Sequence, residues 1–306
     1  MLFYLPFLLG SVKPDSVLDN LEGKIVGGKP VKMESFPFAV KFFNQGAMCS
    51  GTILNSWSIL TAAHCFDHSK DIDEMLIVVG SRYAYDHSAA THDVLRYLIH
   101  EDYNKVMPFA CDIALIFVTS PISFGKRSEK GLLVNTSKWM NANETHLIAT
   151  GWGTTKYGGA ISELGLMQTE LRYVPKKDCE RMHKMKFTAD MFCLYGEGNR
   201  DTCKGDSGGG VLWRRMVIGI VSHGDGCAKK DKPSLYSNVW YFRKWIQKNV
   251  ENFPKKLPIP AELRSQLSCQ APSGQQRDSI PNNKDVQPDQ NYDLRDESST
   301  SPPTIF

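Results

Sequence analysis

The stretch DTCKGDSGGG, residues 201–210, decides the fold of this chain. It places one serine, Ser207, between an acid and a run of glycines, so that the serine would sit on a tight loop. Glycine lets a backbone approach a bound molecule closely and direct N–H groups at it. The same composition also fits a polar, glycine-rich surface turn. The stretch makes Ser207 a candidate nucleophile, and the rest of the chain has to decide between the two interpretations.

Two other stretches contain the groups that a serine nucleophile needs. LTAAHC, residues 60–65, contains His64, and CDIALI, residues 111–116, contains Asp112. A serine hydroxyl is a weak nucleophile at neutral pH and needs a base such as an imidazole, which titrates near neutrality. The imidazole in turn needs a carboxylate that fixes its tautomer and stabilises its cation. The order His64, Asp112, Ser207 provides all three groups, each in an apolar frame.

Together with IVGG at residues 25–28, just after Lys24, these motifs resemble the chymotrypsin-like (trypsin-fold) serine proteases. The resemblance runs from about residue 25 to about residue 253. It implies an all-β fold of two antiparallel six-stranded β-barrels, with the active site in the cleft between them, followed by a C-terminal α-helix. In the family's catalytic scheme His64 is the general base, Asp112 orients it, and the backbone N–H groups of Gly205 and Ser207 form the oxyanion hole.

The hydrophobic pattern agrees with two all-β halves and a final helix. Short apolar runs rich in β-branched residues, separated by polar turns, are typical of antiparallel strands. These runs lie at residues 38–43, 52–60, 75–79, 94–99 and 113–118 in the first half, and at 146–150, 164–174, 211–221 and 235–239 in the second. We expect barrels over about 25–135 and 136–238. The helical spacing of Phe242, Trp245, Ile246 and Val250 predicts a helix over roughly 241–253.

Composition and the N-terminal stretch bear on location and partners. The chain has 306 residues, 42% of them hydrophobic, and a net charge of +3, which is ordinary for a globular protein. Because the chain has no long block of Lys and Arg, nucleic acid is not expected as a partner.

MLFYLPFLLG, residues 1–10, is apolar but too short to span a bilayer, so residues 1–11 are predicted to be a signal peptide. A mistranslated or truncated start is the alternative. We expect a secreted chain with no membrane partner, and its eight cysteines suit an oxidising compartment.

The resemblance implies that residues 12–24 are an activation peptide and that the Lys24–Ile25 bond is cut by a trypsin-like activator. In the family the freed ammonium, here that of Ile25, pairs with the acid before the nucleophile, here Asp206. This pair orders the oxyanion hole and the specificity pocket, so the uncut chain would be a zymogen. No cysteine precedes Ile25, so the cut peptide would leave.

Spacing alone cannot assign disulfides. The resemblance pairs Cys49 with Cys65, Cys179 with Cys193, and Cys203 with Cys227. A further family bridge is missing, because its positions are Leu147 and Trp213. For the two remaining cysteines we expect a Cys111–Cys269 bridge, with separate free thiols or an intermolecular bridge as alternatives.

No metal and no other cofactor is expected. Some family members bind Ca²⁺ in a loop that corresponds to SRYAYDH, residues 81–87, but Ser81 stands where the first glutamate belongs. Hard cations need clustered carboxylates, which this loop lacks. His87, His92 and His100 do not have the spacing of metal ligands.

Two sequons and the C-terminal extension remain. NTS and NET predict glycosylation at Asn135 and Asn143. Residues 254–306 are polar and rich in Pro, Ser, Asp, Gln and Asn, so this extension should be mostly disordered. A solvated extension is favoured over a partner-binding tail.

The specificity pocket is where the chain departs most from the family pattern. The family's floor position is Asp201, whose carboxylate would select Arg or Lys. By the same resemblance Thr202 lies beside Asp201, Gly224 leaves one wall open, and Ser222 hydrogen-bonds Asp112. The departures are Ser234 for a glycine near Asp201, His223 for a tryptophan, Gly210 for a proline, and Phe109 crowding the neighbouring subsite. Ser234 either narrows the pocket or hydrogen-bonds Asp201.

The sequence therefore predicts a secreted serine endopeptidase, made as a zymogen, that cleaves proteins and peptides after Arg or Lys. Its expected partners are its substrates, an activating protease and protein inhibitors, and we expect a monomer. The alternative is a catalytically weak or silent homologue that acts by binding other extracellular molecules. No triad residue is missing, and only His223 and Ser234 favour that alternative.

Overall fold

The computed structural model describes residues 25–256, apart from residues 142, 144–145 and 162. The predicted signal peptide, the activation peptide with Lys24, and the extension from residue 257 on, with Cys269, lie outside the described residues. Residues 254–256 of the predicted extension continue the terminal helix instead. The described chain separates into a body that ends at Ile246 and a second unit that begins at Gln247.

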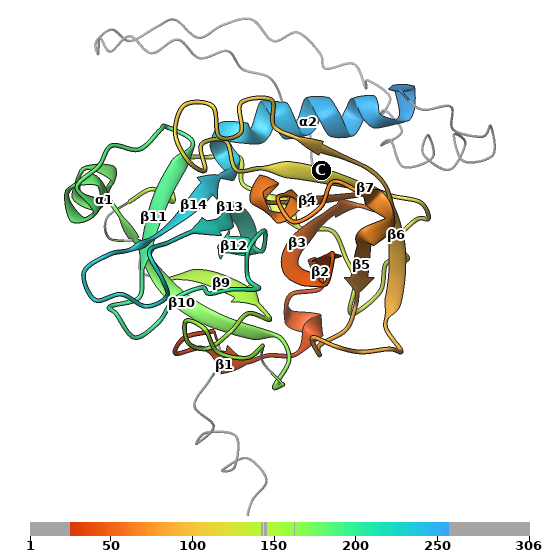
Figure 1. Cartoon of the computed structure of the whole chain (residues 1–306), viewed down its shortest axis with the longest axis horizontal. Coiled ribbons are helices and arrows are strands. Elements are labelled where there is room, and N and C mark those ends of the chain that lie inside the picture. Colours follow the sequence, from red (N-terminus) through yellow and green to blue (C-terminus); the bar gives the residue numbers. More distant parts are fainter. Residues whose placement is uncertain (1–24, 142, 144–145, 162, 257–306) are drawn as a thin grey trace, which may run out of the picture. The chain divides into compact units, whose positions relative to one another are not determined.

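The first barrel consists of six antiparallel strands, which close in the order β2-β3-β4-β7-β6-β5 (Figure 1). Strands β2 and β5 complete the ring through five paired positions. The barrel is made of β2 (Ala39–Asn44), β3 (Ala47–Asn55), β4 (Ser58–Thr61), β5 (Met75–Val79), β6 (Ala90–Ile99) and β7 (Ala114–Val118). All five residues of β7 are buried, which explains why this segment is uniformly apolar in the sequence.

The second barrel closes in the order β9-β10-β11-β14-β13-β12, with β12 pairing back to β9. Its strands are β9 (Leu147–Gly151), β10 (Met167–Val174), β11 (Met191–Tyr195), β12 (Gly210–Trp213), β13 (Met216–His223) and β14 (Ser234–Asn238). Two short strands join its edges: β1 (Lys29–Pro30) pairs with β10, and β8 (Leu132–Leu133) runs parallel to β13. The two-barrel fold predicted from the family resemblance is confirmed.

Two of the predicted strands are hairpins. The run 52–60 turns at Ser56 and Trp57, between β3 and β4, and the run 211–221 turns at Arg214 and Arg215, between β12 and β13. Both arginines have positive φ, 49° and 68°, as a tight two-residue hairpin turn requires. The turns were missed because both flanking strands are apolar and neither turn contains glycine, proline or asparagine. Strand β11 and helix α1 (Lys176–His183) were also not anticipated.

The predicted terminal helix is α2 (Val239–Lys256). Its first residues belong to the body, where Phe242 and Ile246 are buried and the Phe242 ring lies 5.2 Å from that of His100. The Trp245 indole N–H donates to Glu101 at 2.9 Å. Of the helices in the described segments, none combines the length and the apolar character needed to cross a membrane.

Three disulfides brace the body, and they join the pairs that the resemblance implied. Cys49–Cys65 ties β3 to the turn that carries His64, and Cys179–Cys193 ties α1 to β11. Cys203–Cys227 joins the loop that precedes Ser207 to the loop after β13. Cys111 forms no disulfide among the described residues, and Cys269, its predicted partner, lies outside them.

Candidate active site

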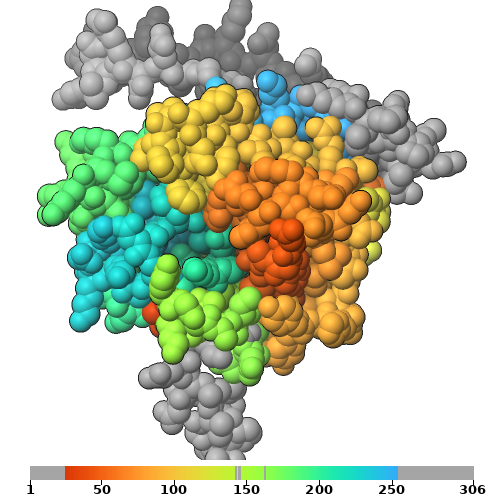
Figure 2. All heavy atoms as spheres, in the orientation of Figure 1, coloured from red at the N-terminus to blue at the C-terminus, as the bar shows by residue number. Residues whose placement is uncertain are grey.

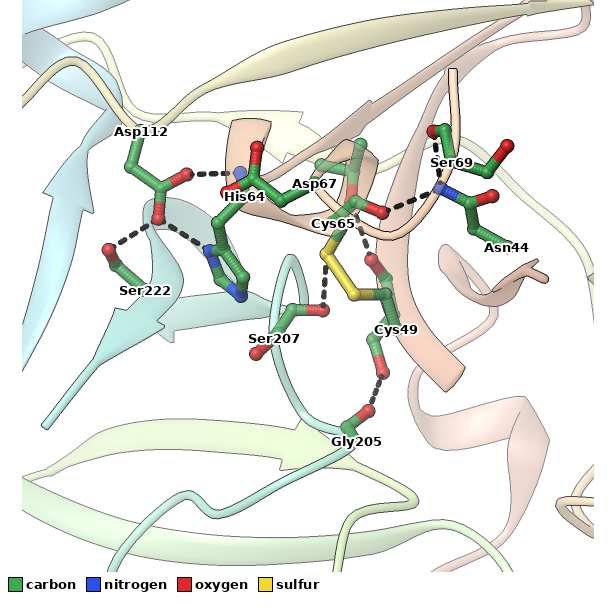
Figure 3. The surroundings of a disulfide bond; sticks show 12 residues. Asn44, Cys49, His64, Cys65, Asp67, Ser69, Asp112, Gly205, Ser207 and Ser222 are labelled. Atoms are coloured by element: carbon green, nitrogen blue, oxygen red, sulfur yellow. Dashed lines mark hydrogen bonds and ion pairs between the residues drawn. A yellow bond between two sulfur atoms is a disulfide. The ribbon is translucent and has the colours of Figure 1, made fainter. Parts of the chain in front are cut away.

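His64 is held by a short 3₁₀ turn, Ala63–Phe66, that directly follows β4. Ala62 and Ala63 are fully buried and Cys65 is fixed by its disulfide, so the backbone around His64 has little freedom. Figure 3 shows the imidazole extending from this turn, with Asp112 on one side and Ser207 on the other.

The His64 imidazole and the Asp112 carboxylate form a closely bonded pair. His64 Nδ1 lies 2.8 Å from Asp112 Oδ2, and the His64 backbone N–H donates to Oδ1 at 2.9 Å. Ser222 donates a further hydrogen bond to Oδ2 at 2.5 Å. Asp112 is fully buried, two residues before the start of β7. The proton of the neutral imidazole therefore sits on Nδ1, and the second ring nitrogen is left on the Ser207 side as a base.

The pKa values of the pair move apart. Burial alone would raise the pKa of Asp112, but the His64 charge and the hydrogen bonds from His64 and Ser222 hold it below its ordinary value. Burial alone would lower the pKa of His64, but attraction to Asp112 and their hydrogen bond raise it above 6.5. This arrangement keeps the carboxylate ionised and makes the imidazole a stronger base.

Ser207 lies on the loop that leads into β12, with its side chain beside the His64 ring (Figure 3). The next residue has to be glycine: Gly208 has a φ of +82°, and a Cβ there would lie 2.2 Å from Thr61 Oγ1. Ser50 N–H donates to the Ser207 carbonyl at 2.7 Å. Among the described residues no hydrogen bond joins the Ser207 hydroxyl to His64, and such contacts often tighten only when substrate binds.

The predicted oxyanion-hole residues lie on this same loop. Gly205 has a φ of +96°, and a Cβ there would lie 2.9 Å from Met48 Cε and 3.0 Å from Gly153 Cα. The Ser50 hydroxyl donates to the Gly205 carbonyl at 3.0 Å. The loop backbone is therefore fixed by its contacts with the first barrel before any substrate binds.

A cavity of about 260 Å³ opens beside Ser207. Figure 2 shows this face hollowed where the yellow, yellow-green and cyan parts of the chain meet. The cavity is lined by six of the predicted pocket residues, but not by Asp201: these are Phe109, Thr202, Ser222, His223, Gly224 and Ser234. Two larger hollows, of about 890 and 630 Å³, are lined by none of these residues.

Asp201 is buried behind the cavity and is fully hydrogen-bonded. Thr202 N–H donates to Oδ1 at 2.8 Å, and Ala228 N–H and Ser234 Oγ donate to Oδ2 at 2.8 and 2.7 Å. Burial raises the pKa of Asp201 to about 6, because these hydrogen bonds offset the loss of solvent only in part. Ser234 also lines the cavity beside Gly224, where a Cβ would lie 2.9 Å from the Ser234 hydroxyl. Of the two roles that the sequence left open for Ser234, the hydrogen bond to Asp201 is the one observed.

Two aromatic rings form one wall of the cavity. Phe109 stacks on His223 with centroids 4.2 Å apart and meets His64 edge-on at 5.7 Å. Phe109 has a φ of 61°, and its N–H donates to Asn104 Oδ1 at 2.6 Å. Burial lowers the pKa of His223 to about 4, so the ring is neutral at pH 7.

Sequence reasoning missed four residues around the site. Asn104 positions Phe109, and Asp190 accepts the Cys111 N–H at 2.8 Å beside Asp112. Tyr157 and Lys204 line the cavity, with the Lys204 Nζ 5.0 Å from the Tyr157 ring centroid. Lys204 belongs to the glycine-rich stretch that contains Ser207, but the other three stand in loops that carry no motif.

Asp206, directly before Ser207, is fully buried. Its Oδ1 accepts from Gly153 N–H at 2.7 Å and its Oδ2 from Cys203 N–H at 2.9 Å. No cationic side chain in the described part of the chain pairs with it, and burial raises its pKa to about 7. Ile25 is fully buried as well, and the adjacent Val26 carbonyl accepts the Asp201 N–H at 3.1 Å.

The remaining predictions concern glycosylation sites and metal ligands. Asn135 and Asn143 are exposed, although residues 144–145 of the second sequon lie outside the described residues. In the part of the chain that the structure describes, the only grouping of three potential metal ligands is Cys49, His64 and Cys65, and its two cysteines are consumed by their disulfide.

A two-barrel fold whose cleft brings together a serine, a histidine and a buried aspartate is typical of serine proteases. The family model of trypsin matches residues 25–246. The chain is 31% identical over 254 residues to trypsin epsilon of Drosophila erecta, covering 82% of this chain and 96% of that one. It is 30% identical over 250 residues to hypodermin-B of Hypoderma lineatum (80% and 95% covered) and 31% over 259 residues to cationic trypsin-3 of Rattus norvegicus (81% and 98%). The chain belongs to the trypsin family of serine endopeptidases.

Proposed function

We propose that this chain is a secreted serine endopeptidase that hydrolyses peptide bonds after lysine or arginine through Ser207, His64 and Asp112. The observation that carries the proposal is the His64–Asp112 pair. A fully buried, ionised carboxylate holds Nδ1 of the imidazole at 2.8 Å and leaves the other ring nitrogen as a base beside Ser207.

The chemistry follows from these positions. His64 takes the proton of the Ser207 hydroxyl while the oxygen attacks the substrate carbonyl, and Asp112 stays ionised. The Gly205 and Ser207 N–H groups stabilise the resulting oxyanion, each by roughly 3 kcal/mol. Protonated His64 then gives its proton to the leaving amine, and water repeats the sequence on the acyl-enzyme.

The preference for a basic residue rests on Asp201. Its buried carboxylate is ionised above a pKa of about 6 and lies behind the cavity. A basic side chain would compensate this charge, whereas an apolar one would leave it isolated in a poorly solvated site.

Asp206 supports activation by cleavage after Lys24. Its buried carboxylate has two backbone N–H donors but no cationic partner among the described residues, and the free ammonium of Ile25 would supply one. A buried carboxylate without its cationic partner is destabilising, so the cut that supplies the Ile25 ammonium acts as a switch.

The activating protease is a partner of the precursor, protein inhibitors are partners of the mature enzyme, and the enzyme acts as a monomer. The three disulfides suit an extracellular location.

The test uses protein whose N-terminus is Ile25, released from a removable tag so that no activating trypsin contaminates the assay. Peptides with Arg, Lys, Phe or Ala before the scissile bond are compared, and a serine-reactive covalent probe reports Ser207. Cleavage after Arg or Lys, with labelling that is lost in His64→Ala and Ser207→Ala, would support the proposal. Cleavage after another residue would refute the role of Asp201. A folded protein that neither cleaves nor is labelled would be a binding homologue.

A further inference from the structure

The floor of the cavity beside Ser207 presents hydroxyl groups, and the carboxylate lies one layer behind them. Thr202 and Ser234 line the cavity, whereas Asp201 does not. Asp201 Oδ2 is already engaged by two donors, Ala228 N–H and the Ser234 hydroxyl, and Oδ1 by Thr202 N–H. A ligand therefore meets Ser234 before it meets the carboxylate.

The direction of the hydroxyl protons follows from their partners. An ionised carboxylate only accepts hydrogen bonds, so the single Ser234 proton points at Asp201 and the Ser234 lone pairs are left toward the cavity. Thr202 Oγ1 lies 2.8 Å from the hydroxyl of Tyr236, which is fully buried. Whichever of the two hydroxyls donates, Thr202 Oγ1 keeps at least one lone pair that can accept a hydrogen bond from a ligand. The floor is then a pair of oxygen acceptors with a negative charge behind them.

Arginine and lysine differ in what they require of such a floor. A guanidinium is a planar fork that binds best when it reaches both oxygens of a carboxylate directly. Here the Ser234 side chain stands in front of Oδ2, so the fork cannot engage both oxygens. A lysine ammonium is a compact point charge with three donors and no fixed plane. It can donate to the Ser234 and Thr202 oxygens while Asp201 compensates its charge from behind.

We infer that the pocket selects lysine over arginine and that Ser234 determines this choice by standing between the substrate and Asp201. The inference rests on the proposed function, because it requires that the chain cleave after a basic residue. It goes further by naming lysine as the preferred substrate side chain and Ser234 as the residue that disfavours arginine.

The experiment measures kcat/KM of the Ile25-terminated enzyme on two peptides that differ only in lysine or arginine before the scissile bond. The expected lysine-to-arginine ratio is at least tenfold. Ser234→Gly removes the side chain in front of Oδ2 and should raise kcat/KM for arginine at least tenfold, which lowers the ratio by the same factor.

Ser234→Ala is the matched control, because it keeps a side chain at this position but removes the hydroxyl. It should lower lysine cleavage severalfold without improving arginine cleavage. Near-UV circular dichroism checks that both variants are folded. A wild-type ratio at or below one, a ratio unchanged in Ser234→Gly, or wild-type lysine cleavage in Ser234→Ala would each overturn the inference. Failure of the proposed function is distinguishable, since the enzyme would then cleave neither peptide and Ser207 would not react with the covalent probe.

Discussion

The Ser222 hydroxyl contacts two groups at once, Asp112 Oδ2 at 2.5 Å and His223 Nδ1 at 3.0 Å. A hydroxyl has one proton, and the ionised Asp112 can only accept. The Ser222 proton therefore points at Asp112, and His223 has to donate from Nδ1 to the Ser222 oxygen. This assignment requires a proton on His223 Nδ1. Because burial lowers the pKa of His223 to about 4, the ring is neutral at pH 7 and carries that proton as its only one. His223 thus lines the cavity and also donates to the Ser222 oxygen while the Ser222 hydroxyl donates to Asp112.

Replacing Ser222 by alanine should weaken catalysis, because Asp112 would lose one of the hydrogen bonds that stabilise its charge. A hydrogen bond to a charged group contributes about 1.5–3 kcal/mol, so kcat/KM should fall by roughly 10- to 100-fold, mainly through kcat. Ser237→Ala is the control, because Ser237 donates to the Asp112 backbone carbonyl at 2.7 Å rather than to the carboxylate. Steady-state kinetics of both variants test this, and equal losses in the two would contradict it.

The raised pKa of His64 predicts the acid limb of the pH profile. Catalysis needs the neutral imidazole, so kcat/KM should rise with pH through the His64 pKa, with a midpoint above 6.5. Because Asp112 is the main cause of the upward shift, Asp112→Asn should move the His64 pKa downward. NMR titration of the His64 ring in a Ser207→Ala background measures this without autolysis, and an unchanged pKa in Asp112→Asn would contradict the assignment.

How far the site could be predicted depends on whether a residue stands in a motif. His64, Asp112 and Ser207 were predicted because each stands next to a recognisable apolar or glycine-rich run, and the structure places them together. Phe109 was expected to crowd a subsite, but its positive φ and its bond to Asn104 could not be foreseen, since nothing in the sequence indicates left-handed backbone at a phenylalanine. Ser234 was identified as a departure, and only the structure shows that it bonds Asp201.

At the scale of elements, one buried lysine connects β2 to the loop at residues 81–88. Lys41 is fully buried, and its Nζ donates to the carbonyl oxygens of Tyr83 and, at 3.5 Å, Ser81. It also lies 5.1 Å from the centroid of Trp152, whose indole N–H donates to the Arg82 carbonyl at 2.6 Å. In this loop, the one that the sequence analysis compared with a Ca²⁺-binding loop, the Lys41 ammonium joins the carbonyl groups.

Lys41 should make stability depend on pH in the alkaline range. Burial lowers the pKa of Lys41 from 10.5 to about 8, and attraction to Asp86 offsets this only in part. Between these values the unfolded chain binds more protons than the folded one, so the free energy of unfolding should rise with pH. Between pH 7.5 and 10.5 the free energy of unfolding of the wild type should rise, relative to that of Lys41→Met, by an amount that approaches about 3 kcal/mol. Denaturant unfolding in a Ser207→Ala background measures it, with Lys126→Met as an exposed control. If the free energy of unfolding changed with pH by the same amount in the wild type and in Lys41→Met, the prediction would be contradicted.

The elements themselves could be predicted where hydrophobicity falls sharply at their ends. Strand β5 coincides with the predicted run 75–79, because charged residues bound it on one side and Gly80 on the other. The β3–β4 and β12–β13 hairpins were merged, since a two-residue turn between buried strands is too short to lower the local hydrophobicity. The closure of each barrel came from the family resemblance, because strand pairing across distant segments is not encoded in any local pattern.

At the scale of the whole molecule, the proposed activation would link the start of the body to the site through Asp206. Gly151 and Gly153 surround its carboxylate so closely that a Cβ at either would lie 2.0 or 2.5 Å from it. The carboxylate has no space to move away and no cation beside it among the described residues. Burial therefore raises the pKa of Asp206 from 3.8 to about 7 in the uncut chain.

This raised pKa predicts that cutting after Lys24 changes the pH dependence of stability. Between pH 4 and 7 the folded uncut chain binds more protons at Asp206 than the unfolded chain does, so its free energy of unfolding should fall as the pH rises. Over this pH range the free energy of unfolding of the uncut chain should fall by as much as about 4 kcal/mol. In the cut protein the Ile25 ammonium would keep Asp206 ionised, which removes this loss. The cut form should therefore be more stable than the uncut form by a margin that widens from pH 4.5 to 7.5.

Denaturant unfolding of two Ser207→Ala proteins tests this prediction, one beginning at Ile25 and the other carrying Lys24→Gln so that the bond stays intact. Asp206→Asn in both is the control, because an amide does not titrate and the widening margin should disappear. If the cut and uncut proteins lose stability in parallel between pH 4.5 and 7.5, the Ile25 ammonium does not reach Asp206. Activation by an ion pair at Asp206 would then have to be abandoned, although the proposed roles of Ser207, His64 and Asp112 would stand.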